Sequence, residues 1–179
     1  LPDYASQPVE ILDRTVAVYI CSPANPQGAV ADWAYWTELL KLAEKHDFRI
    51  FADECYSEIY RDTPPTGALE VAAEMGADPE RVVAFHSLSK RSNLPGLRSG
   101  FVTGGPKTMN EIRQLRTYAG TPLPLPLQMA AAAVWNDEEH VVENRALYQE
   151  KFAIVDSILG DVPGYVSPEA GFFLWLPVE

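Results

Sequence analysis

Three short apolar segments, each followed directly by polar residues, constrain the fold more than any other feature of this sequence. They are 15–20 (TVAVYI), 50–52 within RIFADE, and 81–87 (RVVAFHS). Runs that are apolar on both faces are typical of strands inside a parallel sheet that helices cover. Because segments with helical spacing separate these runs, the sequence predicts a β-α-β-α-β order and therefore an α/β fold.

Helices are predicted between and after these strands. Asp32 is suited to cap the N-terminus of the first helix, and apolar residues then recur at helical spacing until Lys45 and His46, whose charge favours a helix C-terminus. Further helices are expected at 69–76, 105–118 and 124–135, and a further strand at 99–104.

The last part of the chain predicts the start of a second domain. The segment from Glu138 to about Leu159 has a largely helical apolar face, which indicates a connecting helix. After it, 164–176 (GYVSPEAGFFLWL) is expected to supply a first strand or two. We therefore expect 1–140 to be part of one large domain, and 141–179 to be the connecting helix and the beginning of a smaller one.

Composition narrows the class of protein. With 179 residues and 47% hydrophobic content, the chain is long enough for one well-buried domain. Its net charge of −11 argues against a nucleic-acid binder, because such proteins carry clustered Lys and Arg. No stretch approaches a membrane span, and the first residues lack the features of a secretion signal. A cytoplasmic protein without a nucleic-acid or membrane partner is expected.

The cysteines and histidines do not predict a metal centre. Cys21 and Cys55 lie outside any CxxC pattern, which argues against a disulfide framework or a zinc site, and both are expected to fill small spaces in the core. His46, His86 and His140 show no metal-ligand spacing.

The ends of the sequence suggest a fragment. The chain begins without Met and stops at LWLPVE, directly after an apolar segment that is expected to be a strand. The mass of the natural gene product tests this hypothesis, because a mass that matches these residues alone would contradict it.

Polar residues follow each of the three predicted strands. Asn25, Asp53 and Lys90 fall just after, or at the end of, one strand each. Open α/β sheets bind their ligands at the carboxyl ends of the strands, so one pocket is expected to collect all three side chains. An aspartate in this place is weak evidence alone, because it also fits a helix cap or the partner of a surface cation.

The segments around these residues resemble a known family. SPANPQG, FADECY and HSLSKRSNLPGLRSGF are similar, in order and spacing, to the successive cofactor-site segments of fold-type I, class I/II aminotransferases, which depend on pyridoxal 5′-phosphate (PLP). The resemblance implies a three-layer, aspartate aminotransferase-like large domain with a mainly parallel sheet between helices, and the start of a small α+β C-terminal domain. It also implies a homodimer, with its sites at the subunit boundary.

The resemblance assigns the cofactor contacts residue by residue. It implies that Lys90 forms the Schiff base with PLP, and that Ser87 and Arg98 bind the cofactor phosphate. Asp53 falls on the aspartate that contacts the pyridine nitrogen. Tyr56 and Asn25 fall on the hydrogen-bond donors to the ring oxygen, and Asn25 is also expected to contact the substrate. Gln27 departs from the commoner Thr, but its side chain is not a cofactor ligand.

These residue types suit the chemistry. The Lys90 amine must lose a proton to attack an aldehyde, and desolvation and a neighbouring cation such as Arg98 lower the pKa of a lysine. The same amine can then move a proton between the substrate α-carbon and the cofactor, which is general acid–base catalysis. A carboxylate at Asp53 keeps the pyridine nitrogen protonated, so that the ring withdraws electrons. The planar fork of Arg98 suits a phosphate.

Each residue also has a simpler interpretation. Lys90 fits an exposed loop lysine, Arg98 fits a partner of any of the twenty-five carboxylates, and Tyr56 fits a core aromatic. Their joint spacing favours the cofactor site over these readings.

Three alternative functions compete with this interpretation. Asp53 and Glu54 at the end of an apolar strand resemble the magnesium-binding strand of a P-loop NTPase, but no G-x-x-x-x-G-K-[ST] pattern occurs and the glycines of GGPKT (104–108) are wrongly spaced. Two alternatives keep the fold: a carbon–sulfur lyase, and a ligand-sensing domain of a transcription regulator. A helix-turn-helix upstream would favour the sensor.

Within the family, the sequence looks most like bacterial N-succinyldiaminopimelate aminotransferases. The segments that carry this likeness are HSLSKRSNLPGLRSGF, PLPLQMAAAAVWNDEEHVVENRALYQEKF and EAGFFLWL. The resemblance implies glutamate as amino donor and a succinylated keto acid as acceptor, on the route to lysine. No residue here selects a succinyl group by its chemistry. The family's N-terminal phosphate-binding turn, its ring-stacking aromatic residue and its carboxylate-binding arginine have no counterpart in these residues.

Overall fold

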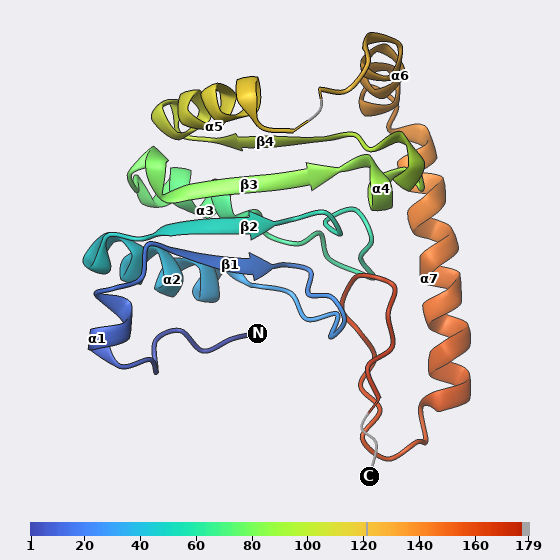
Figure 1. Ribbon diagram of the computed structural model, residues 1–179. Coiled ribbons are helices and arrows are strands. Elements are labelled where there is room, and N and C mark those ends of the chain that lie inside the picture. Colours follow the sequence, from blue (N-terminus) through green and yellow to red (C-terminus); the bar gives the residue numbers. More distant parts are fainter. Residues whose placement is uncertain (121, 177–179) are drawn as a thin grey trace.

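A four-stranded mixed sheet forms the centre of the molecule, in a computed structural model that describes residues 1–120 and 122–176. Its strands lie in the order β1 (Ala17–Cys21), β2 (Arg49–Asp53), β3 (Val82–Ser87) and β4 (Gly100–Gly104). The first three are parallel and β4 is antiparallel to β3 (Figure 1). The predicted α/β fold and its mainly parallel sheet are confirmed.

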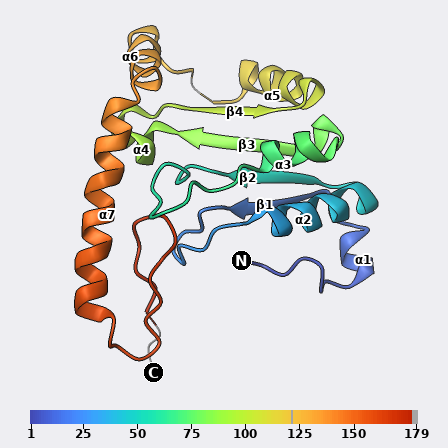
Figure 2. The same cartoon turned by 180° about the vertical axis from the view of Figure 1, so that it is seen from behind.

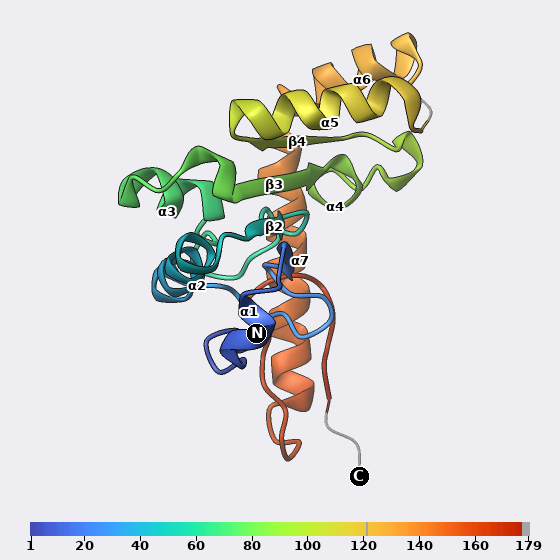
Figure 3. The ribbon, with the colours of Figure 1, turned by 60° about the vertical axis from the view of Figure 1, so that its left-hand side comes forward.

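One face of the sheet is covered by α2 (Trp33–His46) and α3 (Ala68–Met75), as Figure 3 shows. The predicted cap is present, because the Asp32 carboxylate accepts the backbone N–H of Tyr35 at 2.8 Å. Trp36 is fully buried between helix and sheet, and its indole N–H donates to the Thr66 carbonyl at 3.0 Å. The apolar stripe predicted from the sequence therefore lies in the main core of the described residues.

The opposite face of the sheet is open. Its alternate positions carry Tyr19, Phe51 and Phe85, whose neighbouring rings are 4.9 and 6.0 Å apart. Tyr19 is 74% exposed, so no described residue forms the second helical layer of a three-layer arrangement here. The rings line an open hollow of about 500 Å³, which also contacts Cys21 and Asp53.

The remaining helices lie around the edges of the sheet. Short helical turns occur at α1 (Val9–Leu12), η1 (Pro79–Arg81), α4 (Leu88–Arg91) and η2 (Pro95–Leu97), and longer helices at α5 (Pro106–Tyr118), α6 (Leu125–Trp135) and α7 (Glu139–Leu159). Figures 1 and 2 show that α7 runs across the carboxyl ends of β1–β3. The long helices agree with the sequence prediction. The four-residue helix α4, which carries Lys90, was not predicted.

The strand expected within 164–176 is not formed. The described residues of this segment make one isolated antiparallel bridge, between Tyr60 and Ala170, and two flanking backbone hydrogen bonds. The segment lies against the loop after β2 and, through the Ala170 N–H that donates to the Gly28 carbonyl, against the loop after β1. Loops do not offer a row of strand hydrogen bonds. The division into 1–140 and 141–179 remains a prediction, and residues 177–179 of it lie outside the described residues.

Within 1–120 and 122–176, no helix combines the length and apolar character needed to cross a membrane. No group of three or more His, Cys, Asp or Glu side chains in the same ranges is placed to hold a metal ion.

Candidate functional site

The topology places the predicted site residues at one edge of the sheet. Asp53 ends β2 and lies in register between Cys21 of β1 and Phe85 of β3. Ser87 ends β3, Lys90 follows on α4, and Asn25 lies in the loop after β1. The strands are parallel, so their carboxyl ends meet at the edge that α7 crosses (Figure 1).

Asn25 and Tyr56 are in direct contact, although thirty-one positions separate them in sequence. The Asn25 side-chain amide donates to the Tyr56 hydroxyl at 3.0 Å. Tyr56 is buried and Asn25 is exposed. Burial raises the pKa of Tyr56, and the hydrogen bond from Asn25 opposes this shift. The phenol therefore keeps its proton at neutral pH and can donate it to a hydrogen-bond acceptor.

The Lys90 amine lies beside two aromatic rings. Its Nζ is 5.9 Å from the ring centre of Tyr56 and 5.0 Å from that of Phe172. Phe172 in turn stacks on Tyr148 of α7, with centroids 5.7 Å apart and ring planes at 17°. Aromatic faces attract an ammonium group at such distances. Phe172 was not among the predicted site residues, because no local pattern shows that residues 90 and 172 meet.

Asp53 presents an exposed carboxylate at the mouth of the hollow. One of its oxygens accepts the backbone N–H of Cys55 at 3.1 Å. Burial raises the pKa of the Cys55 thiol, and the neighbouring Asp53 raises it further. The pKa of Cys21 is also raised, mainly by burial. Both cysteines are free, and at neutral pH they are protonated thiols with little nucleophilic character.

Ser87 and Arg98 bond to the segments around them, and the Ser87 hydroxyl also donates to the carbonyl of Ser99, the residue after Arg98, at 3.3 Å. The Ser87 hydroxyl oxygen accepts the backbone N–H of Ser89 at 3.0 Å, which caps α4. Arg98 is exposed, has a left-handed backbone with φ of 55°, and donates to the Pro95 carbonyl at 2.8 Å. Within the described residues this arginine thus bonds to its own loop and to none of the other candidates.

The donor set matches the polar groups of PLP. The Lys90 amine suits the aldehyde, and the Asp53 carboxylate suits the pyridine nitrogen. The Tyr56 phenol and the Asn25 amide suit the ring oxygen. The Ser87 hydroxyl and the Arg98 guanidinium suit the phosphate. Of the candidate residues, only Asp53 lines the hollow of about 500 Å³ on the open face, so the match rests on the side chains at the sheet edge and not on that hollow. The roles of the individual residues remain predictions.

Comparison with known proteins gives one consistent family. Residues 3–179 match the family model for aminotransferase class I and II. A crystal structure of an aminotransferase from Neisseria meningitidis is 47% identical, with a TM-score of 0.94 over 99% of this chain and 45% of that chain. The LL-diaminopimelate aminotransferase of Dehalococcoides mccartyi is 32% identical over 99% of this chain and 46% of its own length.

A third relative is also known from a solved structure. The structure of a probable N-succinyldiaminopimelate aminotransferase from Thermus thermophilus is 29% identical, with a TM-score of 0.87 over 99% of this chain and 48% of that chain. The chain thus spans a little under half the length of the relatives that it matches. Because the family model matches residues 3–179, which is nearly the whole sequence, the chain belongs to the aminotransferase class I and II family.

Proposed function

We propose that this chain carries the cofactor attachment lysine and most of the ring contacts of a PLP-dependent aminotransferase, which moves an amino group between an amino acid and a 2-keto acid. The observation that carries the proposal is the contact of three segments distant in sequence. Asn25 bonds to Tyr56 at 3.0 Å, and the Lys90 amine lies 5.9 Å from the ring of the same tyrosine. These are the segments that resemble the family's cofactor site.

In this proposal each side chain has a defined task. Lys90 attaches the aldehyde and, once released, moves a proton to and from the substrate α-carbon. Asp53 accepts a hydrogen bond from the pyridinium N–H and keeps that proton in place. When bound, PLP supplies a ring that withdraws electrons. The proton of Tyr56 is available to the ring oxygen, because burial raises the pKa of its phenol.

The phosphate and the substrate engage the remaining candidates. Ser87 and Arg98 bind the phosphate, one with a hydroxyl proton and the other with a planar pair of N–H groups. For Arg98 this requires that the guanidinium leave the Pro95 carbonyl, to which it now donates. Asn25 is exposed beside Tyr56, so its amide can also contact the substrate.

The rest of the enzyme is also part of the proposal. Its relatives are about twice as long as this chain, which supports the interpretation of these residues as one part of a longer polypeptide. Residues 1–140 then belong to the PLP-binding large domain, and 141–179 are the connecting helix and the start of the small domain. The open aromatic face with Tyr19 suits a covering layer from the remaining polypeptide. We further propose a cytoplasmic homodimer.

For the substrate we propose N-succinyldiaminopimelate transamination with glutamate as donor, in lysine biosynthesis. The support is the resemblance of the cofactor segments and the probable N-succinyldiaminopimelate aminotransferase among the relatives. A curated relative is instead called an LL-diaminopimelate aminotransferase, so the competing acceptor has the same carbon skeleton without the succinyl group.

The lysine assignment is tested by adding PLP to the full-length protein, reducing with borohydride and mapping the modified peptide. The label is expected on Lys90, and Lys90→Ala is expected to abolish it. Lys107→Ala, which removes an exposed lysine on α5, is the matched control and should keep the label. A label at another lysine, or attachment that survives Lys90→Ala, would overturn the assignment.

Single amino acids then test the reaction. An aminotransferase converts bound PLP to the pyridoxamine form and releases one equivalent of keto acid, whereas a carbon–sulfur lyase leaves the cofactor in its aldehyde form. A purified enzyme that transaminates LL-diaminopimelate but ignores the succinylated compound would eliminate our substrate proposal and leave the reaction class intact.

A further inference from the structure

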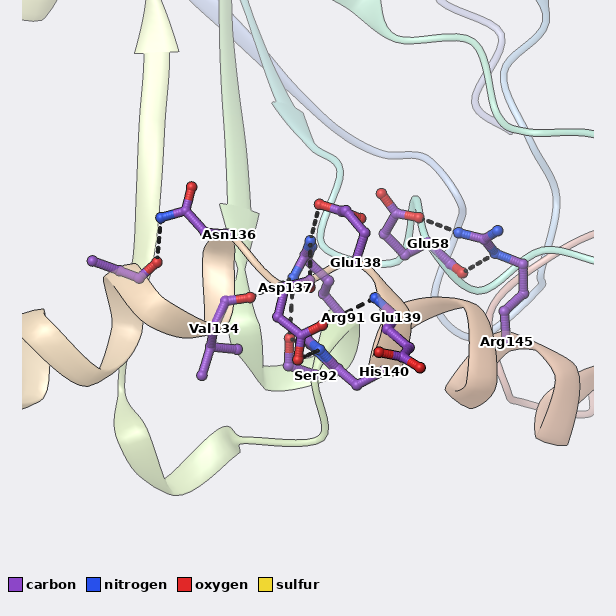
Figure 4. Close-up of polar contacts among 11 residues, drawn as sticks. Glu58, Arg91, Ser92, Val134, Asn136, Asp137, Glu138, Glu139, His140 and Arg145 are labelled. Carbon is purple, nitrogen blue, oxygen red and sulfur yellow. Dashed lines mark hydrogen bonds and ion pairs between the residues drawn. The ribbon is translucent and has the colours of Figure 1, made fainter.

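Arg91, the residue directly after Lys90, is turned into the protein. It is 6% exposed, and its guanidinium lies between α4 and the junction of α6 with α7 (Figure 4). Its Nη1 donates to the Val134 carbonyl at 3.2 Å, and its Nη2 pairs with the carboxylate of Glu138. The guanidinium carbon lies 5.1 Å from the ring centre of Trp135. One side chain thus caps the end of α6 and contacts the start of α7.

A second contact joins α4 to α7 farther along. Asn144 of α7 is buried, and its side-chain amide lies 3.5 Å from the Arg91 backbone carbonyl, to which it donates. Its oxygen accepts the side-chain N–H of Asn93 at 2.6 Å. Between these two, the Ser92 hydroxyl lies 2.8 Å from His140 Nε2. Each of the three residues that follow Lys90 therefore contacts the first turns of α7.

A helix as short as α4 does not hold its own geometry. Four residues allow little more than one turn, and the formation of a first turn is unfavourable in isolation. The position of the Lys90 backbone must therefore be set by what α4 packs against. Of these contacts, the bonds from Arg91 and Asn144 lie nearest to the lysine in sequence, and both are buried.

We propose that Arg91 and Asn144 are positioning residues for Lys90. They attach α4 to α7 and the end of α6, and so set where the amine stands relative to a cofactor that other residues hold. This inference rests on the proposed function. Arg91 acts through the backbone and touches neither the amine nor the ring contacts. Lysine would not replace it, because one ammonium group cannot reach a carbonyl and a carboxylate with the geometry of a planar fork.

Two ligands separate positioning from general structural support. PLP binds through its phosphate, its ring and its bond to Lys90, whereas pyridoxamine 5′-phosphate has no aldehyde and uses the phosphate and ring contacts alone. A displaced Lys90 should therefore weaken the binding of PLP and leave the binding of the pyridoxamine form unchanged. The experiment uses the full-length protein freed of cofactor, with both dissociation constants measured by fluorescence titration.

For Arg91→Met, which keeps an apolar stem but loses the fork, we expect the dissociation constant of PLP to rise about tenfold, since small displacements of a reacting group have large effects. The constant for the pyridoxamine form should change less than about twofold. Asn144→Ala should act in the same direction. If Arg91→Met does not fold, Glu138→Gln replaces it in the test. This substitution removes only the ion pair with Arg91, and the Glu138 side chain is 69% exposed, so the fold should be kept.

Arg61→Met is the matched control. Arg61 also holds α7 through an ion pair, 2.6 Å to Asp156, and its guanidinium carbon lies 5.5 Å from the ring centre of Phe152. It does not contact α4, so its loss should change neither constant. Equal weakening of both ligands in Arg91→Met, or no change of either, would overturn the positioning role. A wild-type protein that fails to attach PLP at Lys90 would instead refute the proposed function.

Discussion

Gly28→Ala tests how closely the Asn25 loop packs against the C-terminal segment. Gly28 is buried and has a left-handed backbone with φ of +72°. A Cβ atom at this position would lie 2.4 Å from the Cβ of Pro168 and 2.9 Å from the carbonyl oxygen of Ala170. The carbonyl oxygen of Gly28 also accepts a hydrogen bond from the backbone N–H of Ala170 at 3.1 Å. Alanine therefore disturbs the backbone conformation, the packing and a hydrogen bond together.

The expected loss follows from these three effects. A left-handed backbone costs an alanine about 1–2 kcal/mol. Separation of the two segments removes a hydrogen bond worth about 1 kcal/mol, and some packing of Pro168 is lost with it. We expect Gly28→Ala to lower the free energy of unfolding by about 3 kcal/mol in total.

Gly76→Ala isolates the backbone effect. Gly76 follows α3 with φ of +64°, and nothing lies within 4 Å of a Cβ built on it. Its replacement should lower the free energy of unfolding by about 1 kcal/mol, from conformational strain alone. Both variants are compared with wild type by urea unfolding of the full-length protein. If Gly28→Ala loses no more than Gly76→Ala, the close approach of the two segments does not contribute to stability, and the packing argument fails.

Three other outcomes are expected. Trp36→Ala removes a fully buried ring and should lower the free energy of unfolding by about 4 kcal/mol; a loss below about 1 kcal/mol would contradict its place in the core. Hydrogen bonds from Ser167 and Tyr165, with the charge of Arg61, lower the pKa of Asp156 to about 2 from 3.8. The stability that this carboxylate contributes is therefore complete above about pH 4 and is lost as the pH falls toward 2, so Asp156→Asn should flatten that acid limb in urea midpoints measured against pH. Partial burial and the neighbouring Asp53 raise the pKa of Cys55. Iodoacetamide at pH 8 should therefore alkylate this thiol at least about tenfold more slowly in native than in unfolded protein, and equal rates would contradict the raised pKa.

Much of the fold was predictable because its signals are local. The two-sided apolar runs at 15–20, 50–52 and 81–87 became parallel strands, and the helical stripe after Asp32 became the buried face of α2. Such periodicities depend on neighbours a few residues away. The prediction of a strand within 164–176 was wrong, because a strand also needs a partner strand, and the segment's own sequence does not specify that partner.

For the candidate site too, part of the arrangement was predictable from the sequence and part was not. By itself the sequence determined the alternation of strands and helices, and the placement of Asn25, Asp53 and Lys90 at strand ends, because topology brings the ends of parallel strands to one edge. Only the tertiary structure decided that Phe172 stands 5.0 Å from the Lys90 amine, and that Arg91 turns inward to the end of α6. Contacts between residues far apart in the chain depend on how whole elements pack, and no local pattern encodes that packing.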